Sequence, residues 1–150
     1  MARSESAASV RAGAVPGIIV NGVLLYAANV WPGWWSVPFL TPSTTRVMDA
    51  VNAAWIAGLV ANAVYLLVGS PAIRALGEMV VLVFGLLATL RVWDVFPFDF
   101  ADGSFDWALL MRIVLVVAVV GAVIGLIAQL VAFVRALVRL GGGGRELRHP

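Results

Sequence analysis

Four long stretches of this chain are apolar and free of charge, and they limit the folds that are open to it. Charged residues are absent from Ala12 to Thr45, from Ala50 to Ile73, from Met79 to Leu90 and from Ile113 to Val134. A helix of about 20 apolar residues crosses the roughly 30 Å hydrocarbon core of a bilayer. We therefore predict an all-α integral membrane protein, an up-down-up-down bundle of four transmembrane helices.

The composition excludes several other classes of protein. Hydrophobic residues make up 62% of the 150 residues and charged residues 12%, whereas a soluble domain has about 45–50% and about 25%. This balance excludes a soluble enzyme, a disordered chain and a nucleic-acid-binding module. The net charge is only +2, so we expect the lipid bilayer as a partner and no nucleic acid.

Proline, glycine and charge set the predicted boundaries. We expect spans at about 15–31, 45–68, 72–93 and 107–140, loops at about 32–44 and 94–106, an N-terminal segment at 1–13 and a flexible tail at 141–150. The first span has a signal-peptide alternative, because Arg3 and Arg11 precede it. Bulky tryptophans follow it where a cleavage site needs small residues, so a retained anchor is favoured.

The arginines predict the orientation of the spans. Seven of the ten lie in the N-terminal segment, in the turn between the second and third spans, and in the last part of the chain; three lie at the opposite end. Cytoplasmic segments carry an excess of basic residues. We therefore expect a multi-pass protein of a bacterial cell membrane, with both termini in the cytoplasm and both long loops outside.

Charged residues recur at helical spacing near the predicted external end. Arg46 and Asp49 are three residues apart, as are Arg91 and Asp94, so each pair shares a helix face. Arg112 lies about one turn into the fourth span, and we expect it to pair with Asp49 or Asp94. As structure, this network neutralises charges and fixes helix ends. As function, the three arginines converge on an anionic ligand such as a lipid phosphate. The structural interpretation is favoured.

Aromatic residues gather on the same predicted external side. The candidate docking rim consists of Trp31, Trp34, Trp35, Phe39, Trp93, Phe96, Phe98 and Trp107. An ordinary aromatic belt would be divided between both membrane interfaces. The rim would therefore either lie on the outer headgroups or form a docking surface for a partner, and both interpretations stay open.

Small and polar residues inside the spans predict helix packing. Gly58 belongs to a row of small residues on the second span, and Gly121 and Gly125 form a GxxxG on the fourth. They either pack within the bundle or, on the fourth span, form a face for self-association. Asn21 and Asn62 fall at comparable depth, and we expect a hydrogen bond between them, because lipid offers no partner.

The sequence carries no motif for catalysis. It contains no cysteine, its one histidine is His149, and no acid, lysine or histidine lies at mid-membrane, where proton-coupled transport usually needs one. We expect no enzyme, no metal and no cofactor. The predicted function is a non-catalytic accessory or scaffold subunit that binds another membrane protein or forms a homo-oligomer. The alternatives are a small channel or transporter with an anionic or lipid-like substrate at the external Arg/Asp cluster, and a cell-envelope sensor.

Overall fold

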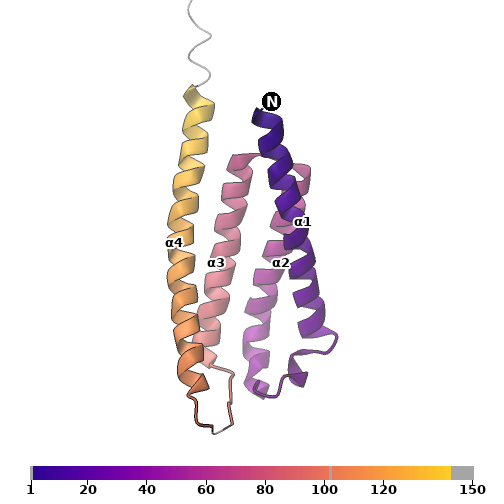
Figure 1. Cartoon of the computed structure of the whole chain (residues 1–150), viewed down its shortest axis with the longest axis vertical. Coiled ribbons are helices and arrows are strands. Elements are labelled where there is room, and N and C mark those ends of the chain that lie inside the picture. The colour runs from indigo at the N-terminus through magenta and orange to yellow at the C-terminus, as the bar shows by residue number, and fades with distance from the viewer. Residues whose placement is uncertain (1, 102, 143–150) are drawn as a thin grey trace, which may run out of the picture.

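The computed structural model describes residues 2–101 and 103–142, with side chains from residue 7 onward. Its elements are α1 (Ala2–Asn29), the short 3₁₀ helices η1 (Trp34–Ser36) and η2 (Pro42–Thr44), α2 (Thr45–Leu67), α3 (Pro71–Val95) and α4 (Trp107–Gly142). The chain between α1 and α2 and the chain between α3 and α4 lie at one end of the molecule and are together called the loop cap (Figure 1). The predicted all-α, up-down-up-down fold is confirmed.

Each of the four helices is long and apolar enough to cross a membrane. Large apolar side chains cover their outer surfaces: Val117 is 64% exposed and Ile124 is 62% exposed. A chain folded in water would bury side chains of this kind, whereas lipid covers them without cost. The fold is therefore that of a multi-pass membrane protein.

The bundle is open on one side. α1 packs on α2, α2 on α3 and α3 on α4, while α1 has only a small contact with α3. In a closed four-helix bundle α4 would also pack against α1, but here the two helices lie at opposite ends of the row (Figure 1). α4 is thus supported mainly by α3.

The first helix begins before the predicted span. Val10 and Ala14 are 6% and 1% exposed and form a buried cluster with Tyr65 of α2. Because these contacts hold the early turns of α1 against α2, the segment before Val15 is part of the helix. At the other end of the chain, α4 includes Gly141 and Gly142 of the predicted tail, and residues 143–150 lie outside the described residues.

Asparagine packs against glycine between α1 and α2. A Cβ atom at Gly58 would lie 2.7 Å from Asn21 Oδ1, and one at Gly17 would collide with the amide of Asn62. Each amide donates to a carbonyl one turn earlier in its own helix: Asn21 Nδ2 to Gly17 O at 2.8 Å, and Asn62 Nδ2 to Gly58 O at 2.7 Å. The predicted hydrogen bond between these two described asparagines is therefore not formed. The glycines let each amide fit against the opposite backbone.

A hydrogen bond between α1 and α2 occurs closer to the loop cap. Asn29 Nδ2 donates to Asn52 Oδ1 at 2.8 Å, and Asn52 Nδ2 donates to Asn29 Oδ1 at 2.9 Å. Both amides are thus satisfied in a region where lipid provides no partner. This pair fixes the register of the two helices.

Candidate functional site

Backbone hydrogen bonds join the two halves of the loop cap. The Thr41 N–H donates to the Pro97 carbonyl at 3.0 Å, and the Asp99 N–H donates to the Phe39 carbonyl at 2.9 Å. They form an isolated antiparallel bridge between segments that are far apart in the sequence. The α1–α2 hairpin and the α3–α4 hairpin are therefore connected at this end as well as through α2 and α3.

A row of four phenylalanine rings runs through the loop cap. Phe39 stacks on Phe100 with ring centroids 5.5 Å apart, Phe100 stacks on Phe98 at 5.9 Å, and Phe98 meets the edge of Phe96 at 5.3 Å. Three of these rings belong to the predicted docking rim. They are used to hold the two halves of the cap together.

The tryptophans of the predicted rim are dispersed. Trp31 is 72% exposed, Trp34 meets Trp35 edge to face at 6.1 Å, and Trp107 meets Phe105 at 4.8 Å. Trp93 lies on α3 beside Arg112 of α4. The candidate rim is therefore part internal packing and part exposed surface, and its docking role stays a prediction.

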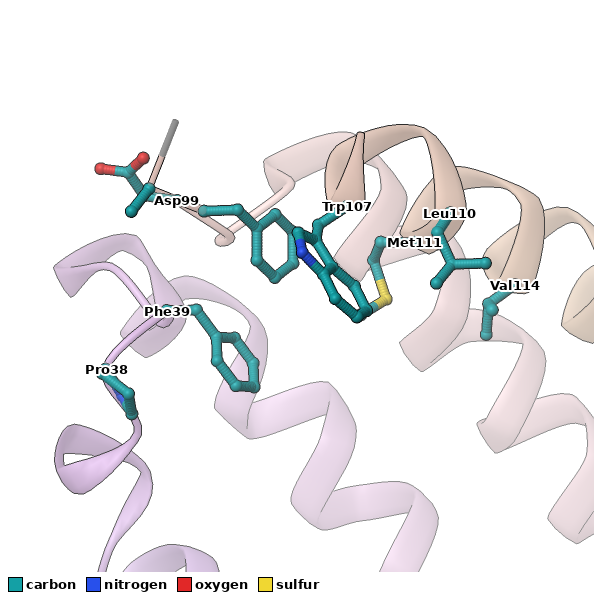
Figure 2. A pocket seen from close by; sticks show the side chains of 9 residues that line it. Pro38, Phe39, Asp99, Trp107, Leu110, Met111 and Val114 are labelled. Carbon is teal, nitrogen blue, oxygen red and sulfur yellow. The ribbon is translucent and has the colours of Figure 1, made fainter. Parts of the chain in front are cut away.

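A pocket of about 590 Å³ lies between the loop cap and the first turns of α4 (Figure 2). Its lining is Pro38, Phe39, Asp99, Phe100, Ala101, Trp107, Leu110, Met111 and Val114. The Asp99 carboxylate points away from Trp107 and Met111 in Figure 2. The pocket is thus an apolar recess, suited to hydrocarbon and without a charged group aimed into it.

Arg112 lies over aromatic rings. Its guanidinium carbon is 4.4 Å from the centroid of Phe96 and 5.8 Å from that of Trp93. The predicted ion pair of Arg112 with Asp49 or Asp94 is absent from the part of the chain that the structure describes. The physical reason is that the negative faces of the two rings attract the cation in place of an acid.

The other two arginines meet between α2 and α3. Arg91 Nε donates to the backbone carbonyl of Arg46 at 3.3 Å, and both side chains are exposed. Arg91 and Trp93 are two residues apart, so they point about 200° apart on α3. Arg112, which lies over Trp93, is therefore on the other side of α3. Arg91 thus contacts only the backbone of Arg46, Arg112 lies apart from both, and the convergence of arginine side chains on one anion stays a prediction.

Asp49 and Asp94 accompany these two arginines without pairing with them. Each aspartate lies three residues after its arginine on the same helix and is exposed. Among the described side chains, neither carboxylate forms an ion pair. The loop-cap ends of α2 and α3 therefore carry two cations and two anions, all accessible from outside the molecule.

Below these charges, α2 and α3 form an apolar groove of about 590 Å³, here called the α2–α3 groove. It is lined by Ala53, Ile56, Ala57, Val60, Ala61, Val64, Tyr65, Ile73, Leu76, Gly77, Val80 and Phe84. Sequence reasoning missed this groove. The signal that points to it is the row of alanines at every fourth position of α2, which leaves space beside the larger residues of α3.

The two glycines of the GxxxG motif on α4 have different neighbours. A Cβ atom at Gly125 would lie 3.1 Å from Leu82 Cδ1 of α3, whereas one at Gly121 would meet nothing within 4 Å. Gly125 therefore packs inside the bundle, which is one of the two predicted roles of the motif. Gly121 is open, so the other role, self-association, stays a prediction.

Gly121 belongs to a longer row of small residues on α4, here called the small-residue face. Its members alternate at spacings of three and four: Ala118, Gly121, Gly125, Ala128 and Ala132. This spacing places them on one side of a helix. All of them are exposed except Gly125, which is partly covered by α3.

Comparisons with protein-family models, with curated proteins and with solved structures find nothing that matches this chain.

Proposed function

We propose that the chain is a non-catalytic membrane subunit that docks a further transmembrane helix against α4. The helix comes from a second copy of the chain or from a larger membrane protein. The observation that carries this proposal is that α4 is packed mainly by α3, while its small-residue face is exposed apart from Gly125.

Small residues matter here because lipid already satisfies apolar side chains. Helices in a bilayer associate through close backbone approach and through polar contacts, since hydrophobic burial gains little. Gly121 has open space in front of it, so a partner helix reaches the α4 backbone there. The alternating spacing of the face favours a left-handed crossing of roughly 20°, as in coiled coils.

We place this subunit in a bacterial cytoplasmic membrane with both termini inside. The distribution of arginines between the two ends of the spans supports this orientation. The loop cap then lies on the outer side.

Photo-crosslinking from α4 tests the proposal. A photoreactive benzophenone amino acid is incorporated at position 121 during synthesis, so that no chemical labelling is needed inside the native membrane. Position 123 is the matched control, because Val123 points about 200° away on the same helix and is 43% exposed. We expect a crosslinked product from position 121 and little from position 123. Equal yields from both positions would contradict docking on this face.

Native mass spectrometry of the tagged protein then identifies the partner. A complex with a larger protein supports an accessory subunit, whereas a homo-oligomer of fixed stoichiometry supports self-assembly and makes ion-flux assays the next step. The channel or transporter and the envelope sensor stay predictions.

Two glycine variants separate association from folding. Gly121→Leu places its side chain in open space, so the isolated chain keeps its stability and the complex dissociates. Gly125→Leu collides with Leu82, so it destabilises the α3–α4 contact itself. If Gly121→Leu leaves the complex intact, α4 is not the docking helix.

A further inference from the structure

The small-residue face of α4 continues into a pocket at each end. Val114 lies seven residues before Gly121, and it lines the pocket under the loop cap (Figure 2). Ala136 and Arg139 lie four and seven residues after Ala132, and they line a pocket of about 600 Å³ at the opposite end, here called the turn pocket. Spacings of four and seven keep residues on one side of a helix. The free side of α4 therefore runs between two pockets.

The distance between the two pockets matches the thickness of a bilayer. From Val114 to Ala136, α4 rises by about 33 Å, and the hydrocarbon core is about 30 Å thick. One acyl chain covers a single leaflet and thus about half of this length. A transmembrane helix covers the whole side, from one pocket to the other.

One face of α3 borders the same open side. Pro71 lines the turn pocket together with Ala136 and Arg139 of α4. Glu78 and Gly85 follow Pro71 at intervals of seven residues, so they share its face of α3 with a drift of about 20° per step. A Cβ atom at Gly85 would meet nothing within 4 Å. This open face of α3 and the small-residue face of α4 together are called the α3–α4 trough.

Glu78 places a carboxyl group of this trough inside the hydrocarbon layer. α3 is 25 residues long, so a core of about 30 Å centred on it leaves about 4 Å of helix outside at each end. Glu78 lies seven residues after Pro71, about 10 Å along the helix, and thus about 7 Å inside the core. Its depth is between the boundary and the middle of the membrane.

The structure shows no partner for this carboxyl group among the described residues. Glu78 is partly buried, yet it forms no hydrogen bond or ion pair with them. The Tyr65 hydroxyl donates to the Arg74 carbonyl at 3.1 Å instead. Arg74 precedes Glu78 by four residues, which is the weaker order for an ion pair along a helix. Ionisable residues inside membrane spans normally pair with another group, so this one calls for a partner from outside the chain.

A second copy that docks through its own α4 does not provide a cation at this depth. Leu82 of α3 lies beside Gly125 of α4, and the two helices are antiparallel (Figure 1). Glu78 is therefore level with about Gln129, one turn after Gly125. No charged residue occurs on α4 from position 113 to position 134.

We propose that Glu78 is the polar anchor of the α3–α4 trough, and that the docked helix belongs to a different membrane protein and carries a lysine or an arginine that pairs with Glu78. This inference rests on the proposed docking function and identifies the partner by its chemistry. A lone cation is as costly in hydrocarbon as a lone carboxylate. The small residues of α4 let the backbones approach, and the ion pair determines which helix is accepted.

Charge variants of Glu78 test the pairing through the photo-crosslink from position 121. From the strength of polar contacts between helices in bilayers, we expect Glu78→Gln to lower the ratio of crosslinked to free chain by roughly three- to twentyfold. Glu78→Lys is expected to abolish the product, because like charges then meet in hydrocarbon. Asp49→Lys is the matched control and is expected to keep the product, since it makes the same change of charge at an exposed position of α2 outside the trough.

The outcomes separate this inference from the docking function. A product from position 121 that is unchanged in Glu78→Gln and Glu78→Lys leaves docking intact and overturns the pairing. A product that consists of two copies of the chain has the same meaning. If the unmodified protein gives no product from position 121, docking itself is refuted and the pairing with it.

Charge exchange gives the decisive support. Peptide mapping of the product identifies the crosslinked helix, and we expect this helix to contain a lysine or an arginine. Replacing that residue with glutamate is expected to restore the complex of the Glu78→Lys variant. A crosslinked helix without a basic residue, or no recovery on exchange, would overturn the inference.

The stability of the isolated chain shows whether Glu78 serves the chain's own fold. Because Glu78 has no partner among the described residues, Glu78→Gln is expected to leave the isolated chain at least as stable as the unmodified protein in a titration with sodium dodecyl sulfate. A loss of stability in Glu78→Gln would mean that the carboxyl group is used within the bundle, and the inference would then be wrong.

Discussion

Gly58→Ala is expected to destabilise the protein although alanine is the better helix former. The new Cβ would lie 2.7 Å from Asn21 Oδ1 and 2.9 Å from Asn21 Cγ. Carbon atoms in contact lie about 3.5–4.0 Å apart, so the amide must move by roughly 1 Å. This movement breaks the 2.8 Å hydrogen bond from Asn21 to the Gly17 carbonyl.

Three terms set the size of the effect. Overpacking costs about 1–3 kcal/mol, and the lost hydrogen bond costs about 0.6 kcal/mol in a membrane. The gain in helix propensity returns about 1 kcal/mol. The net loss in the free energy of unfolding is therefore between about 0.6 and 2.6 kcal/mol.

Titration with sodium dodecyl sulfate in mixed micelles measures this loss, with tryptophan fluorescence as the signal. Gly85→Ala is the matched control, because its Cβ meets nothing within 4 Å in the middle of α3. It is expected to stabilise the protein by up to about 1 kcal/mol. Gly17→Ala is expected to behave like Gly58→Ala. If Gly58→Ala is as stable as Gly85→Ala, then α1 and α2 do not approach each other as described.

Three further substitutions probe single contacts in the same titration. Asn29→Ala leaves Asn52 unpaired and lowers the free energy of unfolding by about 0.6–1.7 kcal/mol. The double variant Asn29→Ala/Asn52→Ala loses less than the sum of the two single variants. Strict additivity would mean that the pair does not interact. Tyr65→Phe removes the hydrogen bond to the first turn of α3 and costs about 0.6 kcal/mol, while no change would show that this bond is not formed. Arg112→Met keeps a long apolar stem but removes the cation over Phe96, at a cost of about 0.5–1 kcal/mol; a more stable variant would contradict the cation–π contact.

The four helices and their alternating direction were predictable because a bilayer leaves few choices. Long apolar runs must form helices there, and Gly69 with Pro71 permits only a short connection between the second and third. The helix itself begins at Ala2, well before the span predicted from about residue 15, and so includes Arg11. Val10 and Ala14 on either side of it pack inward and hold the helix together.

The contacts between helices were harder to predict than the helices. Asn21 lies against Gly58 and Asn62 against Gly17, so the two amides are offset by about one helical turn, and a hydrogen bond between them is not the only way to satisfy an amide. Each bonds its own helix and packs against a glycine of the other. The sequence contains this arrangement twice: Gly17 is followed four residues later by Asn21, and Gly58 is followed four residues later by Asn62. This repeat is the sequence signal for asparagine packing against glycine, which membrane depth alone does not reveal.

The candidate site was predicted in part for a similar reason. Spacing along one helix places Arg46 and Arg91 at the correct end of α2 and α3, but it does not show which side of a neighbouring helix a third residue faces. Arg112 lies across α3 from Arg91 and over aromatic rings. The pairing of the two loops has no local sequence pattern, because only a single isolated bridge joins them.

The row-like packing of the helices has a consequence for synthesis. Because each helix packs mainly on the one before it, every helix that enters the membrane finds its neighbour already in place. Contacts between chain neighbours form faster than contacts between distant segments. The bridge from Thr41 to Pro97 is the exception, since the first loop must wait for α3 to be complete. Insertion is thus expected to proceed in the order of the chain, with the two loops able to join as soon as α3 is in place and before α4 is complete.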